Sequence, residues 1–492
     1  MIWKIARKEF LLNLMTFKFA AATSVCMVLT AVFTPILAKD YQQRLNAYRE
    51  NVTRNEAEMG KIKVYEHLKP TVFRPPAALS IFSQGLEKQF GNSVKVVYNE
   101  VPEISVAAAN HYLSIFPVFD ASLLFKIVMS VLALLVAYDA VSGEREQGTL
   151  RLMLSGTTAR YQVLLGKLLA GLMVVAVPTA VTFIVGLLIL LSFPMVNLAG
   201  SDWIRIGFMF LASLLFVGTM YNLGLLFSSV AGRSATSLVL GLFFWVLFVL
   251  VIPNATIYVA TQLRQLARED QLNDQIAALM REREQEFKEQ YTLLGRGVSS
   301  GSSSTSDVTD AFGRFYMRSC NNALMERNLI RYSIGAPLEV KYAEKQWEVK
   351  YNGYLRGLFE QRRLAGHLAR ISPISLYENV MSALAGTDMA GFQQFIDGVR
   401  AYRNDVVEYL RAKTNNFSLP CFFTPCTEEE MVTRPHTDNA PALEVSDAPQ
   451  FRYTRHTTED LRRALPDLGL LAAVNVVLLA LAFVAFARYD VR

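Results

Sequence analysis

A dense polar stretch, Tyr138-Asp139-Ala140-Val141-Ser142-Gly143-Glu144-Arg145-Glu146-Gln147-Gly148-Thr149-Leu150, separates two long apolar runs. The run before it, Ala121 to Ala137, contains Lys126 as its only charged residue, and the run after it, Leu164 to Leu191, contains only Lys167. An apolar helix of about 20 residues matches the thickness of the hydrocarbon core of a bilayer, whereas buried helices of soluble proteins are usually shorter. The pattern therefore predicts two membrane spans joined by a polar loop.

The composition of the whole chain supports a membrane protein. Hydrophobic residues make up 52% of the 492 residues and charged residues only 19%, against roughly a quarter charged in soluble domains. The first apolar run follows three cationic residues and lacks a small-residue cleavage site, so we expect a retained span rather than a signal peptide. The apolar residues concentrate in about six runs: Phe17 to Ala38, Ala121 to Tyr138, Leu164 to Leu191, Ile204 to Val230, Ala235 to Ile252, and Leu468 to Phe486.

Two long polar segments divide these runs into groups. The predicted fold class is an all-α polytopic membrane protein with about six transmembrane helices, plus a mostly helical extracytoplasmic domain with minor β structure. We expect an amphipathic interfacial helix and the first transmembrane helix in 1–38, a first extracytoplasmic segment in 39–119, transmembrane helices two to five in 120–252 with a cytoplasmic loop at 139–163, a second extracytoplasmic segment in 253–466, and the last transmembrane helix with a cytoplasmic tail in 467–492.

Lysine and arginine in the short loops indicate the orientation, because cationic flanks stay on the cytoplasmic side. The loop after the second span has Arg145, Arg151 and Arg160, the turn between the fourth and fifth spans has Arg233, and the connection Phe193 to Asp202 has none. We expect both termini in the cytoplasm of a bacterium, the spans in its inner membrane and both large segments in the periplasm. The positive-inside bias and ordinary surface charge account for the net charge of +6 and leave no need for a nucleic-acid partner.

The two large polar segments carry mixed signals. In the first, Tyr41 to His67 suits a helix that extends out of the first span and is ended by Arg74-Pro75-Pro76, and Val94 to Tyr98 suits a strand. In the second, Ile257 to Leu294 predicts a long helix that either packs on its own domain or serves as a partner-binding rod. Helical patterns also cover Ala311 to Leu329, Val340 to Ile371 and Gly391 to Ala412.

The sequence contains little that indicates catalysis. There is no His-Glu-x-x-His motif and no phosphate-binding Gly-x4-Gly-Lys-Ser/Thr loop, so we expect no enzyme activity from this chain alone. Cys421 and Cys426 lie in the second polar segment, where an oxidising compartment favours a disulfide. A zinc site completed by His436 or His456 is the alternative, although the spacing fits no standard finger.

Three motifs together resemble a known family. The run Gly143-Glu144-Arg145-Glu146, Gly148-Thr149-Leu150, then Arg160 and Gly166-Lys167, is similar to the loop after the second span in permease subunits of type-2 ABC exporters. Leu226 to Ser234 resembles the family's turn between spans four and five, and Phe486 to Val491 resembles its carboxyl end. The two large external segments resemble the subgroup with enlarged external domains.

The resemblance implies a permease that works with other subunits. It implies a cytoplasmic ABC ATPase that binds ATP and Mg, a second permease subunit in a homodimer or heterodimer, the lipid bilayer, and a potential periplasmic partner. The residues that the resemblance assigns to coupling with the ATPase are Asp139, Gly143, Glu144, Arg145, Glu146, Gly148, Thr149 and Arg160.

Physical chemistry is consistent with this role but leaves two alternatives open. Glu144 and Glu146 would stabilise the positive end of a short helix, and Arg145 could pair with acidic groups on the ATPase. The residues from Met1 to Leu14 suit a helix in the membrane interface. One alternative is that both segments are merely solvated cationic flanks. The other is a non-transporting membrane component of an envelope motility or assembly machine, whose external domain binds a partner protein.

Overall fold

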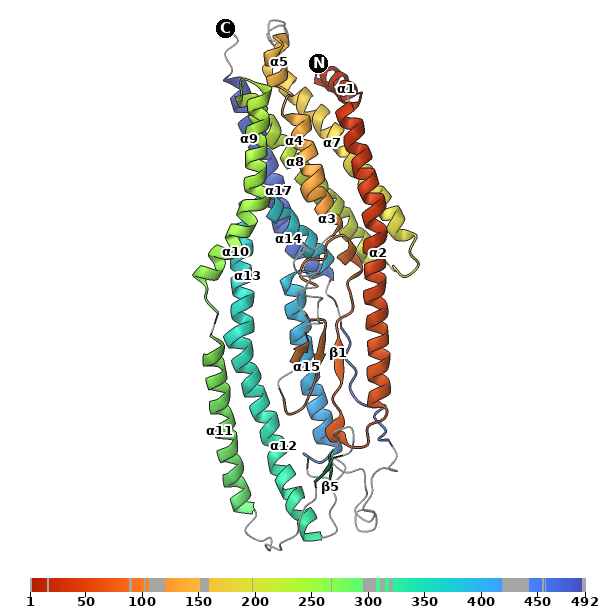
Figure 1. The fold of residues 1–492 in the computed structure, drawn as a ribbon, viewed down its shortest axis with the longest axis vertical. Coiled ribbons are helices and arrows are strands. Elements are labelled where there is room, and N and C mark those ends of the chain that lie inside the picture. Colours follow the sequence, from red (N-terminus) through yellow and green to blue (C-terminus); the bar gives the residue numbers. More distant parts are fainter. Residues whose placement is uncertain are drawn as a thin grey trace.

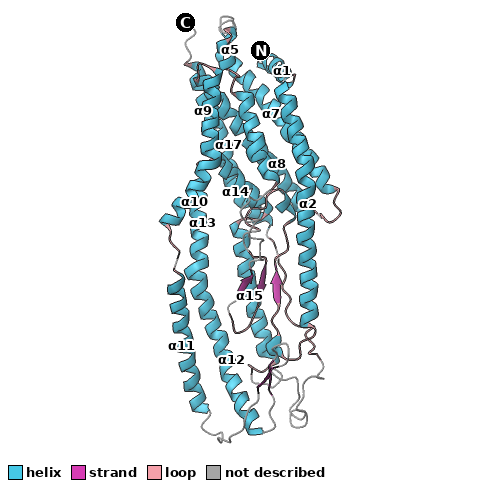
Figure 2. Cartoon of the chain, viewed as in Figure 1, coloured by secondary structure: helices cyan, strands magenta, loops and turns pink. Residues whose placement is uncertain are grey.

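Six helices are long and apolar enough to cross a membrane among the residues that the computed structural model describes. They are Phe19–Met59, Ala121–Glu146, Arg160–Leu191, Gly200–Val230, Ser234–Leu263 and Thr457–Ala487. Helices dominate the molecule (Figure 2), and strands are few and short. The expected fold class is confirmed. The structure describes residues 2–15, 17–87, 91–100, 103–105, 120–150, 159–196, 198–266, 268–294, 307–309, 315–317, 322–417, 442–453, 455 and 457–488.

The molecule is elongated, with the candidate spans in one half (Figure 1). Helix α1 and the ends of α9 and α17 lie together at the far end of that half. The helices of this half are α1 (Ile2–Leu14), α2 (Phe17–Met59), α3 (Ala121–Leu123), the π-helix η3 (Leu124–Met129), α4 (Ser130–Ala137), α5 (Ser142–Glu146), α7 (Arg160–Leu191), α8 (Gly200–Val230), α9 (Ser234–Val246), the π-helix η4 (Leu247–Val251), α10 (Ile252–Leu263) and α17 (Thr457–Ala487).

The other half, which we call the polar domain, combines the far end of α2 with the described parts of residues 60–105 and 264–455. A three-stranded antiparallel sheet in the order β1-β2-β3 pairs Val72 with Val94 and Val94 with Ile104. Its helices and strands are η1 (Tyr65–His67), η2 (Ala78–Ile81), β1 (Thr71–Phe73), β2 (Ser93–Lys95), β3 (Glu103–Ser105), α11 (Glu269–Leu294), β4 (Asp307–Thr309), β5 (Phe315–Met317), α12 (Asn322–Lys350), the π-helix η6 (Tyr351–Leu355), α13 (Arg356–Ala369), α14 (Pro373–Ala385) and α15 (Met389–Lys413).

The helix that leaves the first span is continuous with it and ends earlier than the sequence suggested. Helix α2 runs without interruption for 43 residues. It ends at Met59 because Gly60 follows and Ile62, only 8% exposed, turns back into the core of the polar domain. The Arg74-Pro75-Pro76 sequence lies beyond β1 and therefore does not end the helix.

The predicted helix from Ile257 to Leu294 is two helices. Helix α10 ends at Leu263 because Arg264 adopts an extended backbone conformation, and α11 begins at Glu269. Phe287 and Tyr291 of α11 pack against the buried Tyr342 of α12. The interpretation of this segment as a helix packed on its own domain is therefore confirmed for α11.

Helix α14 was missed by the sequence analysis. It begins with Pro373 and ends at Gly386, whose φ of 64° is readily adopted only by glycine. Tyr377 is fully buried, its ring stacks on Phe216 of α8 at 4.8 Å between centroids, and its hydroxyl lies 3.1 Å from that of Ser213. Its apolar residues Tyr377, Val380, Met381 and Leu384 follow helical spacing, and the helix packs against α8 and α17.

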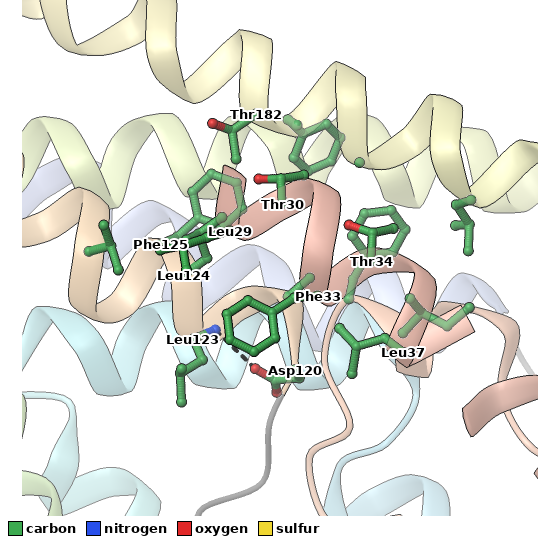
Figure 3. A pocket seen from close by; sticks show the side chains of 17 residues that line it. Leu29, Thr30, Phe33, Thr34, Leu37, Asp120, Leu123, Leu124, Phe125 and Thr182 are labelled. Carbon is green, nitrogen blue, oxygen red and sulfur yellow. Dashed lines mark hydrogen bonds between the residues drawn. The ribbon is translucent and has the colours of Figure 1, made fainter. Parts of the chain in front are cut away.

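An apolar cavity lies among α2, the α3–η3 segment and α7, on the side of the spans that faces the polar domain (Figure 3). Asp120 closes its polar edge and caps α3 by accepting a hydrogen bond from the Leu123 N–H at 3.0 Å. The Thr182 hydroxyl on its wall is buried without a hydrogen-bond partner among the described residues. The spans therefore pack less tightly here than around α8, whose core-facing residues are fully buried.

Candidate coupling site

The polar stretch that follows Ala137 folds into a turn and the short helix α5. The backbone N–H groups of Val141 and Ser142 both donate to the Ser228 hydroxyl, at 2.9 and 3.0 Å. Ser228 is fully buried near the end of α8, so one side chain satisfies two of the donors that any helix start leaves unpaired. The start of α5 is thereby fixed to the fourth candidate span.

Glu144 is bound inside the molecule. Its Oε1 atom lies 2.7 Å from the Lys167 Nζ atom of α7, and the same Nζ lies 3.3 Å from Oε1 of Glu9 in α1. The Lys167 side chain is 4% exposed and each carboxylate is 22% exposed. One buried cation therefore joins α1, α5 and α7. The sequence motif included Lys167 but the predicted coupling residues did not, and we expected Glu144 to contact an ATPase.

Arg145 and Glu146 bind the turn between α8 and α9. Arg145 donates from Nη1 to the Ala231 carbonyl oxygen at 3.0 Å. Glu146 accepts hydrogen bonds from the Ser234 N–H at 3.1 Å and from its hydroxyl at 2.7 Å. The sequence analysis singled out both segments separately, and the structure brings them into direct contact.

The remaining predicted residues lie at the same end of the molecule. Arg160 begins α7 and donates from Nη1 to the Ala487 carbonyl oxygen at 2.7 Å, which connects the third motif to the other two. Thr149 donates from its hydroxyl to the Glu144 carbonyl oxygen at 3.2 Å, and Gly148 has a φ of 71°, a conformation that favours glycine. The Asp139 carbonyl oxygen accepts from the Gly143 N–H at 2.9 Å, which starts the turn of α5.

Close packing brings α1 against α7 next to Lys167. A side-chain Cβ at Gly166 would lie 2.8 Å from Cγ2 of Ile5, which is closer than such atoms approach in proteins. Tyr221 of α8, which is 2% exposed, donates its hydroxyl to the Lys167 carbonyl oxygen at 3.1 Å. Glu9, Ser228 and Tyr221 were not among the predicted coupling residues, because only packing brings their side chains to this site.

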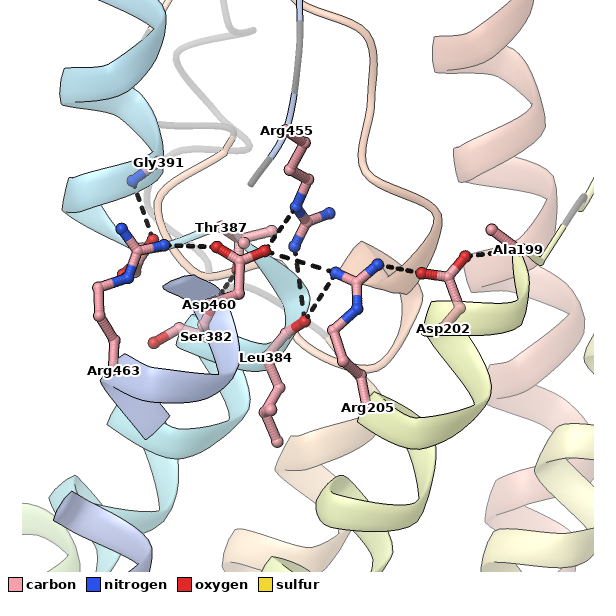
Figure 4. Close-up of polar contacts among 12 residues, drawn as sticks. Ala199, Asp202, Arg205, Ser382, Leu384, Thr387, Gly391, Arg455, Asp460 and Arg463 are labelled. Atoms are coloured by element: carbon pink, nitrogen blue, oxygen red, sulfur yellow. Dashed lines mark hydrogen bonds and ion pairs between the residues drawn. The ribbon is translucent and has the colours of Figure 1, made fainter. Parts of the chain in front are cut away.

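A second charged cluster lies where the spans meet the polar domain (Figure 4). Asp460 at the start of α17 is 2% exposed, pairs with Arg455 at 2.8 Å and Arg205 at 3.6 Å, and also contacts Arg463. Asp202 pairs with Arg205 and accepts a hydrogen bond from the Ala199 N–H at 2.8 Å. We call these residues, with Asp388, the charged junction.

Asp388 extends the charged junction into α15. It caps that helix by accepting from the Gly391 N–H at 3.0 Å, and its Oδ2 atom lies 3.4 Å from Nε of Arg463. Burial raises the pKa of the Asp388 carboxyl in spite of the neighbouring Arg463. Arg205 also donates to the Leu384 carbonyl oxygen of α14 at 3.2 Å. The junction therefore links α8, α14, α15 and α17.

No metal site is present in the part of the chain that the structure describes, where no three His, Cys, Asp or Glu side chains form a suitable group. Cys421 and Cys426, with His436 and His456, lie outside the described residues, so both the disulfide and the zinc alternative stay predictions.

Comparison with known proteins identifies relatives and a family. The "Probable ABC transporter permease protein NosY" of Pseudomonas aeruginosa is 36% identical over 125 residues, which are 25% of this chain and 46% of that protein. The protein of the same name from Stutzerimonas stutzeri is 37% identical over 128 residues, 25% of this chain and 45% of its own. The chain thus spans about half the length of these relatives. The model of the family described as "ABC-2 family transporter protein" matches residues 3–491. The chain therefore belongs to the ABC-2 family of transporter proteins.

Proposed function

We propose that this chain is the permease subunit of an ATP-driven exporter and works with two separate cytoplasmic ABC ATPases. It pairs with a second permease, which is either another copy or a related subunit, and ATP and Mg bind to the ATPases. The observation that carries the proposal is the position of α5, which binds α7 through Glu144 and the α8–α9 turn through Arg145 and Glu146, while the same Lys167 of α7 also binds Glu9 of α1. A force applied to α5 is passed directly to these elements.

The part of the site that faces solvent is only a portion of the predicted coupling residues. Glu146, Gln147, Gly148 and Thr149 are exposed, whereas Glu144 and Arg145 are partly buried against the protein. We infer that the tip from Gln147 to Thr149 contacts the ATPase, and that Glu144 and Arg145 transmit the resulting movement. Closure of the ATPase pair on ATP would then rock the spans.

A single substitution at the tip tests this contact. We expect Gln147→Arg to lower the amount of ATPase that copurifies with the tagged permease at least 10-fold, because a long cationic side chain would enter a packed interface. Quantification of both subunits after purification from native membranes measures the ratio. The matched control is Gln271→Arg, at an exposed position of α11 in the polar domain, which should leave the ratio unchanged. Equal ATPase recovery with both variants would place the contact elsewhere.

We further propose that the spans lie in the inner membrane of a bacterium with both termini in the cytoplasm. In a background without the four native cysteines, a membrane-impermeant maleimide should label Gln271→Cys in intact spheroplasts and should label Gln147→Cys only after lysis. Both side chains are exposed, so access rather than burial decides the result. Labelling of Gln147→Cys before lysis would reverse the orientation and remove the tip from the cytoplasm.

The polar domain is the natural place for a protein partner in the periplasm. Helix α11 packs on α12 through one face and keeps charged residues exposed elsewhere, including Glu284 and Lys288. Such a partner would suit either the exporter or a non-transporting envelope machine. Substrate movement measured with and without the ATPase distinguishes them, because only in the exporter should loss of the ATPase abolish it.

A further inference from the structure

The polar domain contains a cleft that the proposed function does not use. It lies between the far end of α2, strand β1, helix α15 and the segment from Leu443 to Tyr453, and its volume is about 580 Å³. Pockets for small molecules are commonly about 300–1,000 Å³ in size. The cleft is therefore large enough for a small organic molecule.

Aromatic side chains form much of the wall. They are Tyr48, Phe73, Tyr402, Phe451 and Tyr453. Several are held in fixed positions by their neighbours. The Phe451 ring lies edge-on to Tyr402 at 5.5 Å and to Phe395 at 6.0 Å between centroids, and the Tyr402 hydroxyl donates to the Pro449 carbonyl oxygen at 3.0 Å. A ligand in the cleft would therefore meet the faces and edges of these rings without any rearrangement of the side chains.

The charged side chains that line the cleft have one sign, although Lys413 of α15 lies within electrostatic reach of Glu444. Glu56 and Glu444 line it, and no lysine or arginine does so among the described residues. This is a local exception in a chain with a net charge of +6. The polar remainder, which includes Asn55, Ser446 and Gln450, is uncharged. Carboxylates together with aromatic faces attract cations, whereas they repel phosphates and carboxylates.

We propose that this cleft binds a small organic cation, an amine or quaternary ammonium compound with an apolar or aromatic group. The apolar group packs on Val52, Val72 and Val406, and the cationic centre lies against the rings and between the two carboxylates. The site bridges α2, which continues the first candidate span, and α15, which belongs to the polar domain. The proposal of this binding site does not rest on the proposed coupling to an ATPase.

The test uses the full chain in nanodiscs and three probes of similar size. Benzyltrimethylammonium is the cation, benzyl alcohol the neutral probe and phenylacetate the anion, each titrated at pH 7 and followed by calorimetry or saturation-transfer NMR. We expect saturable binding of the cation at least 10-fold tighter than that of benzyl alcohol, and no binding of phenylacetate.

Variants locate the binding in the cleft. Glu56→Gln combined with Glu444→Gln should weaken binding of the cation at least 10-fold and leave benzyl alcohol unaffected. Tyr48→Leu should weaken the cation more than the neutral probe. The matched control is Glu58→Gln, an exposed carboxylate on the same helix that does not line the cleft. Absence of cation binding at 10 mM, equal binding of the neutral probe, or equal effects of Glu58→Gln and the double variant would overturn the proposal.

Discussion

Replacing Lys167 with methionine is expected to destabilise the protein by about 3–5 kcal/mol, because removal of one partner leaves buried charge without compensation. The Lys167 side chain is 4% exposed between Glu144 and Glu9, so the variant would hold two neighbouring carboxylates with only the more distant Lys8 as a cation. We expect α1 to pack less firmly on α7, and ATP turnover of the assembled complex to fall with it. Thermal inactivation of the purified protein and ATPase activity of the complex measure the two effects.

Two further variants separate charge from shape. Lys288→Met removes a cation that pairs with Glu284 at 2.6 Å but is 68% exposed, and should cost less than about 1 kcal/mol. The triple variant Lys167→Met, Glu144→Gln, Glu9→Gln removes the uncompensated carboxylates and should recover much of the stability, although not the coupling. If Lys167→Met lowers stability no more than Lys288→Met does, the ion pairs of Lys167 do not stabilise the fold.

Replacing Asp460 with asparagine is expected to have an effect of similar size at the other end of the spans. Asp460 is 2% exposed and lies among Arg205, Arg455 and Arg463. The isosteric change keeps the volume and removes the charge that holds three guanidinium groups together. We expect a loss of about 3–5 kcal/mol, since a buried network is left with unbalanced charge.

Rates of thermal inactivation are the proper measurement, because large membrane proteins commonly unfold irreversibly. The control is Asp270→Asn, which removes a carboxylate that is 60% exposed and pairs with Arg268 at 2.9 Å. It should change the half-life very little. Added salt should also affect the two pairs differently, since screening acts on exposed charges far more than on buried ones. Identical behaviour of the two variants would show that the charged junction does not hold the polar domain to the spans.

The sequence predicted the six candidate spans well, for a physical reason. Long apolar runs can be satisfied only by a bilayer, and a polar stretch between two of them must lie outside the hydrocarbon. The contacts inside the site were not predictable. Lys167, Glu144 and Glu9 come from three separate helices, and no local pattern states that their side chains meet. Conversely, the charges of Glu144 and Arg145 suggested an external contact, whereas Glu144 pairs with Lys167 and Arg145 donates to the Ala231 carbonyl oxygen inside the molecule.

The polar domain was harder to predict because tertiary packing decides its elements. The break between α10 and α11 occurs in a run without glycine or proline, so propensity alone did not reveal it. Helix α14 packs into the end of the span bundle, although its apolar residues do follow helical spacing. The strand expected at Val94 to Tyr98 is present as β2, which begins one residue earlier, at Ser93, and ends at Lys95.

Helix α2 also has a mechanical consequence. Its 43 residues form one rod of about 65 Å, with one end beside the coupling site and the other in the cleft of the polar domain. Pro35 lies within the rod and is the place where a helix most readily bends. Beyond it the arm is about 36 Å long, so a tilt of about 10° would displace Met59 by roughly 6 Å. A small tilt of α2 at Pro35 would therefore widen or narrow the cleft at its far end.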